Sequence, residues 1–243
     1  MLKPDKFFTP SGYIYNELFK TTDLVWEAIA QISPVIKKLI SPNLSQIRRE
    51  GSLVLEDTLL ENGAMIRAGA YLDGDEIEIG EGALIEPSAY VKGPTIIGKN
   101  SVVRHSAYIR GNVILGKNSV AGHSTEIKNS ALLEESKAGH FAYIGDSILG
   151  AVNLGAGTKL ANLKLTGEEV RVKVAGKIYK TGLRKFGAIM GDGVQTGCNS
   201  VTMPGTILAQ NAAVYPNLTA RGYYPAGTII KLRQNIEEME LNL

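Results

Sequence analysis

An aliphatic residue at every sixth position dominates the middle of this sequence. From Ile79 to Gly139, nine of the eleven positions spaced six apart are Ile, Val or Leu. Nine of the eleven positions four residues further on are small or β-branched. Helices repeat every ~3.6 residues, and a sandwich spaces its strands by about 8–12. The period therefore predicts short strands closed by turns and stacked into a parallel β-helix, with one aliphatic side chain per segment pointing inward.

The repeat continues on both sides with shifts of register, and we expect the coil to occupy residues 51–222. Residues 1–50 form an N-terminal helical segment in this prediction, with Thr22 or Asp23 as an N-cap and a second short helix that starts at Pro34. Residues 223–243 are expected to form a C-terminal helical tail. Both ends are expected to cap the open edges of the coil.

One long insertion, residues 163–187, interrupts the repeat. Val170, Val172 and Val174 alternate with basic residues before a second apolar pair. This alternation predicts a β-hairpin that projects from the coil. A long excursion in a compact repeat is more often functional than idle.

Composition excludes several classes of protein. Hydrophobic residues make up 44% and charged residues 21% of the chain, and the net charge is +2, which argues against a dedicated nucleic-acid binder. No run approaches the ~20 apolar residues of a membrane helix, and the opening residues do not resemble a signal peptide. The single cysteine, Cys198, excludes an internal disulfide and favours a reducing compartment. We expect a cytoplasmic protein with neither nucleic acid nor membrane as a partner.

The aliphatic pattern breaks in the segment "SKAGHFAYIGD", which begins at Ser136. Gly139 takes an aliphatic slot, while Lys137 and Tyr143 take slots that are small elsewhere. His140 lies in the same segment. A histidine that is neutral near pH 7 can accept a proton from an ammonium group or a hydroxyl. Bulky polar substitutions in a regular repeat are expected where function overrides consistency with the fold, so the break is a candidate active site.

Positions 18 residues apart would lie on neighbouring coils about 4.8 Å apart. One predicted outward column contains Lys92, Arg110 and Lys128. Like charges this close repel unless an anion lies beside them, which suggests a phosphate or another anionic ligand. A basic edge neutralised by local carboxylates such as Glu126 is the alternative. A second predicted column contains Glu86, Arg104, Gly122 and His140.

Several motifs carry a resemblance to a known family. "IGEGAL", "IGKNSV" and "LGKNSV" resemble the hexapeptide-repeat acyltransferases, which implies a left-handed β-helix of triangular cross-section with 18-residue coils. "EIKNSALLEESKAGHFAYIGDS", "VNLGAGTKLANLK" and "LRKFGAIMGDGVQTG" resemble the acetyltransferase domain of the bifunctional UDP-N-acetylglucosamine-synthesising enzymes. The "VRVKVAGK" segment is most similar to the archaeal-type sugar-1-phosphate nucleotidylyltransferase–acetyltransferases. The resemblance is dense over residues 105–205. The expected fold is mainly β: a left-handed parallel β-helix with N-terminal helices, an inserted hairpin and a short C-terminal helix.

The resemblance implies an N-acetyltransferase that uses acetyl-CoA and no metal. Its expected acceptor is an amino-sugar 1-phosphate, foremost glucosamine 1-phosphate, in the UDP-N-acetylhexosamine biosynthesis that supplies the cell envelope. His140 matches the general base, which takes the proton of the sugar amine as the amine attacks the thioester. Substrate-binding positions match at Arg110, Lys128, Tyr143, Asn153, Asn162 and Lys185, and cofactor-binding positions at Ala156 and Cys198.

The resemblance also implies a homotrimer in which Asn162 or Lys185 completes a neighbouring pocket. No glycine-rich nucleotide-binding segment precedes the coil. We therefore expect either a one-step enzyme or a separate chain that supplies nucleotidylyl transfer.

Two other functions stay open from the sequence. His105 and His123 are 18 residues apart and His140 follows 17 later, so stacked histidines could bind zinc, as in the carbonic-anhydrase-like hexapeptide enzymes. The close histidine pair of that family, four residues apart, is missing here. The other alternative is a non-catalytic β-helical scaffold or sugar-nucleotide-binding protein. The sequence does not distinguish glucosamine from galactosamine or another amino sugar.

Overall fold

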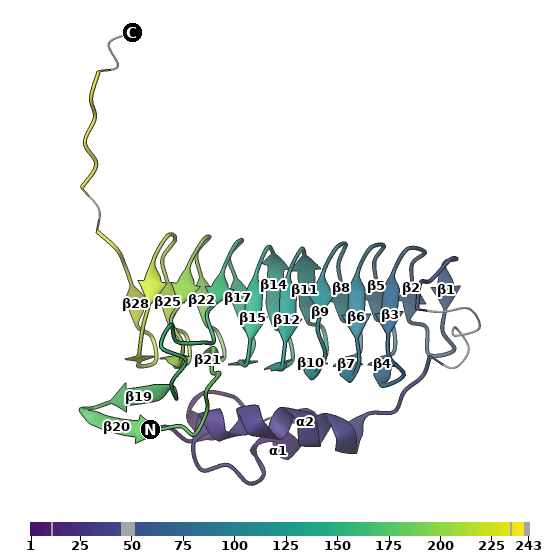
Figure 1. The fold of residues 1–243 in the computed structure, drawn as a ribbon, viewed down its shortest axis with the longest axis horizontal. Coiled ribbons are helices and arrows are strands. Elements are labelled where there is room, and N and C mark those ends of the chain that lie inside the picture. Colours follow the sequence, from purple (N-terminus) through teal and green to yellow (C-terminus); the bar gives the residue numbers. More distant parts are fainter. Residues whose placement is uncertain (11, 45–51, 234, 241–243) are drawn as a thin grey trace.

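The computed structural model describes residues 1–10, 12–44, 52–233 and 235–240. Within them the chain winds into a long coil, with helices and a hairpin along one side (Figure 1). Each turn of the coil adds a strand to each of three sheets, which we number in the order the chain meets them. We call the bend from sheet 1 to sheet 2 the first corner, that from sheet 2 to sheet 3 the second, and that from sheet 3 back to sheet 1 the third.

The strands are short throughout. Sheet 1 contains β1 (Thr58–Leu59), β2 (Met65–Ile66), β5 (Leu84–Ile85), β8 (Val102–Val103), β11 (Val120–His123), β14 (Lys137–His140), β17 (Asn153–Leu154), β22 (Gln195–Thr196), β25 (Ala213–Val214) and β28 (Ile229–Ile230). Sheet 2 contains β3 (Tyr71–Asp73), β6 (Tyr90–Lys92), β9 (Tyr108–Ile109), β12 (Glu126–Lys128), β15 (Tyr143–Gly145), β18 (Lys159–Leu160), β23 (Val201–Thr202) and β26 (Thr219–Ala220). Sheet 3 contains β4 (Ile77–Ile79), β7 (Thr95–Ile97), β10 (Val113–Leu115), β13 (Ser130–Leu132), β16 (Ile148–Leu149), β21 (Ala188–Met190), β24 (Thr206–Leu208) and β27 (Tyr223–Tyr224).

Neighbouring strands in these sheets run parallel, apart from the antiparallel pair β1–β2. The prediction of a mainly β, left-handed parallel β-helix is confirmed. Aliphatic side chains of all three sheets fill the interior, as the six-residue period predicted. Asparagines such as Asn100 and Asn118 turn the chain with φ values of 55° and 57°. Asn tolerates this left-handed region better than most residues, which explains its recurrence at the turns.

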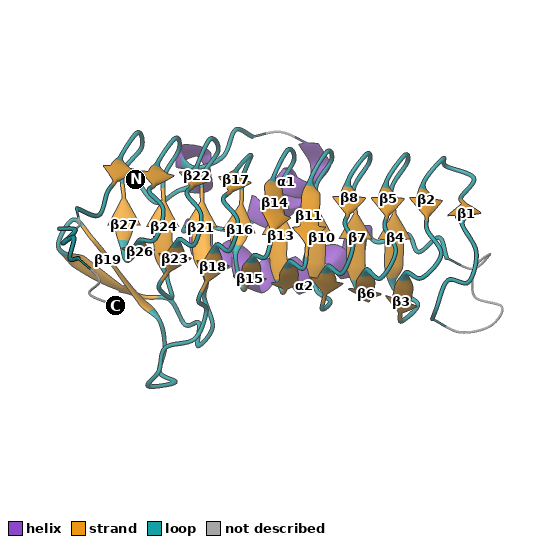
Figure 2. Ribbon diagram, turned by 90° about the horizontal axis from the view of Figure 1, so that it is seen from above, coloured by secondary structure: helices purple, strands orange, loops and turns teal. Residues whose placement is uncertain are grey.

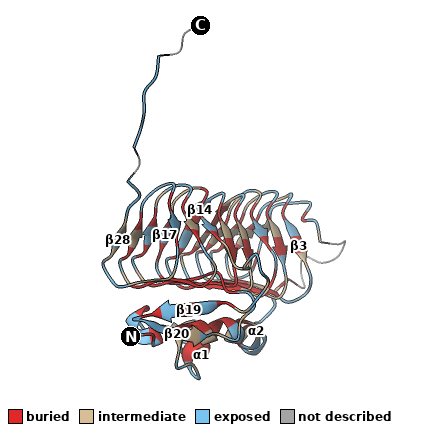
Figure 3. Ribbon diagram, turned by 60° about the vertical axis from the view of Figure 1, so that its left-hand side comes forward, coloured by how far each residue is buried: buried red, intermediate tan, exposed pale blue. Residues whose placement is uncertain are grey.

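The outer face of sheet 3 is also apolar, which the period did not reveal. Ile114, Ile148 and Ile189 point away from the coil interior and are fully buried. Helices α1 (Gly12–Phe19) and α2 (Ala28–Leu39) lie against this face (Figures 1 and 2). Figure 3 shows a band of buried residues along the side of the coil that faces the helices, in addition to the buried residues within the coil. The helices of the N-terminal segment therefore cover a side of the coil. Leu44, which follows them, is buried with the aliphatic side chains of the coil interior.

The helix boundaries differ from those predicted. Short 3₁₀ helices, η1 (Pro4–Lys6) and η2 (Val25–Glu27), precede the α-helices, and Pro34 lies inside α2. Burial of the apolar stripe of α2 against β10 and β13 outweighs the hydrogen bond that proline cannot make. Neither Thr22 nor Asp23 caps the helix. The Glu27 carboxylate instead accepts hydrogen bonds from the backbone N–H groups of Asp23 (2.9 Å) and Leu24 (3.0 Å).

The insertion forms the predicted hairpin, β19 (Arg171–Val174) with β20 (Lys177–Lys180). It does not project freely. Val170, Val172 and Val174 are buried in the cluster that joins the helices to sheet 3, and Tyr179 meets Trp26 edge-on at 5.7 Å. The alternating valines are therefore one half of a packing surface whose other half is the N-terminal segment.

The predicted C-terminal helix is wrong. The coil continues past residue 222 to β28, and the described residues beyond it, 231–233 and 235–240, contain no helix. They leave the coil as an exposed extended segment (Figure 1), in which Ile236 and Met239 are 84% and 86% exposed. Short helices are marginal without a packing partner, and these side chains have none in the described chain. Residues 45–51, where the predicted helical segment meets the predicted coil, lie outside the described residues. No helix in the described part of the chain is long and apolar enough to cross a membrane.

We predict that Ile148→Ala lowers the free energy of unfolding by about 2–4 kcal/mol, because Ile148 is fully buried between sheet 3 and the helices. Urea denaturation followed by circular dichroism measures this. Leu165→Ala is the control, since Leu165 is fully exposed, and it should change stability by less than about 0.5 kcal/mol. Equal losses in the two variants would contradict the proposed packing of the outer face.

Candidate active site

The broken motif is a change of coil length. Strands β11 and β14 pair with an offset of 17 residues, Val120 with Lys137 and His123 with His140. The next coil is shorter still, because Lys137 pairs with Asn153. The prediction that His140 stacks on Gly122 is therefore wrong, since it assumed an 18-residue coil.

Two glycines accommodate the shortened coil. Ala138 fills the inward aliphatic position, and Gly122 faces Gly139 across the two strands. A Cβ atom on Gly122 would lie 1.8 Å from the Gly139 carbonyl oxygen, whereas a Cβ on Gly139 would meet nothing within 4 Å. The backbones thus approach so closely that only glycine fits at position 122.

His140 ends β14 at the first corner, and its side chain is exposed. Backbone hydrogen bonds stack this corner coil on coil: Phe141 N–H to the His123 oxygen (2.8 Å), Gly157 N–H to the His140 oxygen (3.0 Å), and Asn199 N–H to the Ala156 oxygen (2.8 Å). The resulting column runs His105, His123, His140, Ala156, Cys198. The residue predicted as base and the two predicted to bind acetyl-CoA therefore lie on three successive coils, about 4.8 Å apart.

The three stacked histidines are not equivalent. The rings of His105 and His123 lie parallel, 5.5 Å between centroids. The Nδ1 atom of each is 3.0 Å from a carbonyl oxygen of the preceding coil, which assigns the proton to Nδ1. No hydrogen bond to the His140 ring is formed among the described residues. The His140 imidazole is thus free to engage a ligand.

The turn that follows on the next coil is made of Gly155, Ala156 and Gly157. The N–H groups of Gly155 and Gly157 are bonded within the coil, but that of Ala156 takes part in no backbone or side-chain hydrogen bond of the described chain. A free N–H beside a candidate base is the kind of donor that stabilises an oxyanion. Cys198, one coil further, is exposed and unpaired.

The outer face of sheet 2 begins beside His140. Tyr143 aligns with Glu126 and Tyr108 on the preceding coils. The Arg110 side chain folds back over this row: its guanidinium hydrogen-bonds Glu126 at 2.6 Å and lies 5.7 Å from the centre of the Tyr108 ring. The Glu126 hydrogen bond raises the pKa of Arg110. Burial raises the pKa of the Tyr143 phenol, and the charges of Glu126 and Asp146 act in the same direction.

A second group of predicted residues gathers at the second corner, around the Asp146 carboxylate. Lys128 lies 3.7 Å from it, and the Asn129 and Asn162 amides donate hydrogen bonds to it. The Tyr143 hydroxyl donates to Asn162 at 3.4 Å, which joins this group to the row above.

Lys185 returns to the same corner after the hairpin. Its backbone forms an isolated antiparallel β-bridge with Leu163, the neighbour of Asn162, and the residue is exposed. Asn153 instead lies on sheet 1 beside Lys137, on the other side of the first corner.

The structure therefore separates two sets of residues within one chain. His140, Ala156 and Cys198 mark the first corner, while Lys128, Asn162 and Lys185 mark the second. Four residues separate His140 from Gly145, which aligns with Lys128, so the two sets lie on the order of 12–15 Å apart. Tyr143 and the Arg110 guanidinium occupy the face between them. A ligand that touches both sets must span the outer face of sheet 2.

The predicted cation column is present, but each cation has a carboxylate. Lys92 pairs with Asp73 at 3.5 Å, Arg110 with Glu126 and Lys128 with Asp146. These ion pairs agree with the alternative stated above, a basic edge that is neutralised by local carboxylates. Arg110 and Glu126 are substantially exposed, which leaves the guanidinium accessible to an incoming anion.

Several site residues were missed by the sequence analysis. Lys159 aligns with Tyr143 on the next coil. Its ammonium group donates a hydrogen bond to the backbone oxygen of Gly157 at 2.7 Å, next to Ala156 of the His140 column. Asp146 holds the second corner together. Phe141 has a φ of 52° at a turn position where the preceding coils have serine, and its ring meets that of His123 edge-on at 5.1 Å. A bulky residue with a positive φ is unusual. The replacement of serine by Phe141 at this turn position was therefore a sign of the site that the sequence offered.

The described residues contain no group of three or more His, Cys, Asp or Glu placed to hold a metal ion.

Comparisons with known proteins agree with the motifs. A family model described as "GMPPB C-terminal domain" matches residues 91–181. The "Bifunctional sugar-1-phosphate nucleotidylyltransferase/acetyltransferase" of Sulfurisphaera tokodaii is 44% identical over 86 residues, which are 35% of this chain and 21% of that protein. The "Bifunctional protein GlmU" of Synechococcus is 32% identical over 201 residues, 78% of this chain and 41% of that protein.

The predicted resemblance is confirmed. The chain is similar to GlmU-type bifunctional proteins along much of its coil, and it spans between 21% and 41% of the length of these two relatives. Among solved structures, the UDP-N-acetylglucosamine acyltransferase of Campylobacter jejuni matches with a TM-score of 0.40 and 15% identity, over 66% of this chain and 69% of that one.

We predict that Gly122→Ala lowers the free energy of unfolding by about 2–3 kcal/mol, because its Cβ would force β11 and β14 apart. Gly139→Ala is the matched control on the facing residue and should cost less than about 0.5 kcal/mol. Chemical denaturation of the two variants measures the difference. A Gly139→Ala loss as large as that of Gly122→Ala would contradict the close approach.

Proposed function

We propose that this protein transfers the acetyl group of acetyl-CoA to the amine of an amino-sugar 1-phosphate, with glucosamine 1-phosphate as the first candidate. The observation that carries the proposal is the first corner, where the free imidazole of His140 lies one coil from the unused N–H of Ala156. The confirmed similarity to proteins named as acetyltransferases supports it. The alternative of a non-catalytic scaffold does not account for this pairing of a base with an oxyanion donor.

The reaction needs one nitrogen–carbon bond to form and one carbon–sulfur bond to break. The neutral sugar amine attacks the thioester carbonyl carbon, and His140 accepts the proton that the nitrogen loses. The Ala156 N–H stabilises the negative oxygen of the tetrahedral intermediate. Collapse of the intermediate expels the CoA thiolate, which takes the proton from His140. No acyl-enzyme is required, so Cys198 acts as a contact for CoA and not as a nucleophile.

The sugar phosphate lies along the outer face of sheet 2 in this proposal. Its amine reaches His140 at the first corner, and its phosphate, on the neighbouring ring carbon, reaches the Arg110 guanidinium that folds back over the row of Tyr143. The long side chains of Lys128 and Lys185 extend toward the phosphate from the second corner. The anion replaces Glu126 as the partner of the exposed Arg110 guanidinium, because a phosphate oxygen accepts the hydrogen bond that the guanidinium donates to Glu126. Holding the substrate at both ends fixes the amine within attack distance of the thioester.

Further ligand contacts follow from the remaining predicted residues. Tyr143 lies between the two ends and contacts the sugar ring. Asn162 and Lys185 lie at the second corner, and Asn153 lies around the first corner on another face, so we propose that a homotrimer shares these residues between neighbouring chains.

We predict that His140→Ala lowers the rate of acetyl transfer by about 10²–10⁴-fold without loss of folding, because a general base contributes that much to such a step. Thiol release from acetyl-CoA is measured with glucosamine 1-phosphate, galactosamine 1-phosphate and glucosamine. His105→Ala is the matched control, two coils away in the same column, and should retain wild-type turnover. Free glucosamine should be a poor acceptor, since it lacks the phosphate that Arg110 and Lys128 hold.

Near-wild-type turnover by a folded His140→Ala variant would contradict the role of His140. No thiol release by the wild-type protein with any acceptor of the panel would contradict acetyl transfer to these amino sugars.

A further inference from the structure

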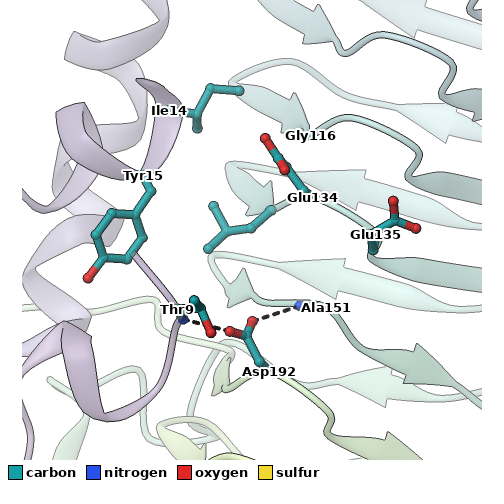
Figure 4. Close-up of a pocket in the computed structure, with 9 residues that line it drawn as sticks. Thr9, Ile14, Tyr15, Gly116, Glu134, Glu135, Ala151 and Asp192 are labelled. Atoms are coloured by element: carbon teal, nitrogen blue, oxygen red, sulfur yellow. Dashed lines mark hydrogen bonds between the residues drawn. The ribbon is translucent and has the colours of Figure 1, made fainter. Parts of the chain in front are cut away.

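A cavity of about 300 Å³ lies away from the candidate active site, between helix α1 and the third corner of the coil (Figure 4). Ile14 and Tyr15 line it from the helix. Leu133, Glu134 and Asp192 line it from the coil, on turns that precede strands of sheet 1. A volume of this size suits the body of a small organic molecule, at the lower end of the usual range for ligand sites.

The charged residues of this cavity are all acidic. In the described chain its lining includes Glu134, Glu135 and Asp192 and contains no lysine, arginine or histidine. Asp192 is already satisfied, because it accepts the backbone N–H groups of Thr9 (2.6 Å) and Ala151 (3.0 Å). An anion such as a sugar phosphate or CoA would therefore meet only repulsion here.

The two glutamates differ. Glu135 accepts a hydrogen bond from the Asn118 amide and is turned away from the helix in Figure 4. Glu134 has no hydrogen-bond or ion-pair partner among the described residues, and Figure 4 shows its carboxylate on the side of the cavity toward α1. Glu134 is thus the acidic group that a ligand can engage.

Tyr15 supplies the opposite wall. Burial raises the pKa of its phenol, with Asp5 and Asp192 acting in the same direction, so the ring stays neutral over the physiological range. The ring packs against Phe19 at 4.8 Å between centroids, and together with Ile14 and Leu133 it offers apolar surface for the body of a ligand. The lining as a whole combines a carboxylate, an aromatic ring and an aliphatic floor, which is the combination that recognises an organic ammonium ion.

We propose that this cavity binds a small primary amine in its ammonium form, with the charged head at Glu134 and the apolar body against Tyr15, Ile14 and Leu133. The site is separate from the one proposed for acetyl transfer and selects the opposite charge. Its occupant contacts the turn that leads into β14, the strand that ends in His140. The inference does not depend on the proposed function.

The experiment uses 4-phenylbutylamine as the probe, with 4-phenyl-1-butanol and 4-phenylbutyrate as neutral and anionic analogues. We expect saturable one-to-one binding of the amine by isothermal titration calorimetry, about fivefold or more tighter than the alcohol, and no binding of the carboxylate. Glu134→Gln should weaken amine binding by about the same factor. Glu135→Gln is the matched control and should stay within about twofold of wild type.

No saturable binding of the amine to the wild-type protein would overturn the proposal. So would equal affinities for amine and alcohol, or a folded Glu134→Gln variant that binds the amine as tightly as wild type. This experiment measures binding of a cation and not acetyl transfer. A negative result here therefore does not test the proposed acetyl transfer, and a negative acetyl-transfer assay does not test this binding site.

Discussion

Hydrogen bonding between successive coils is the constraint on which the rest of this structure depends. Each strand of two to four residues is too short to be stable alone, so every coil takes its position from the coil before it. A residue at a corner is therefore fixed relative to the residues above and below it in the same column. Functional groups that are far apart in sequence, such as His140 and Cys198, become near neighbours through this stacking alone.

The shortened coil turns that regular scaffold into a site. Loss of one residue between β11 and β14 brings Gly122 against Gly139 and places Phe141 at a turn position that earlier coils fill with serine. The same change sets His140 apart from His105 and His123, whose rings are both tied to carbonyl groups. A regular β-helix would repeat one environment at every coil, whereas this irregularity gives one imidazole an environment of its own.

The sequence predicted the features that follow from periodicity. The six-residue pattern located the parallel strands and the inward aliphatic residues, and the alternating valines located the hairpin. The resemblance of the motifs to a known acetyltransferase family indicated His140, Arg110 and Lys128 as candidate site residues from the sequence alone. The predictions of the strands and of the hairpin succeeded because inward packing imposes a strict pattern on the chain. The roles of His140, Arg110 and Lys128 stay predictions.

Other features were not predictable because long-range contacts decide them. Pro34 continues a helix only because sheet 3 offers an apolar outer face, and the tail near Ile236 stays extended because nothing in the described chain packs on it. The 17-residue register depends on the contact of Gly122 with Gly139, which no local propensity encodes. Glu126 was named from the sequence as a neutralising carboxylate, but Asp146, the partner of Lys128, lies 18 residues away and is set by the coil geometry.

A crystal structure of the protein with CoA and glucosamine 1-phosphate tests the central claim most directly. The account predicts the sugar amine within about 3.2 Å of a His140 ring nitrogen, the CoA sulfur beside Ala156, and the phosphate in contact with Arg110 or Lys128. An amine bound away from the first corner, with His140 contacting neither ligand, would contradict it.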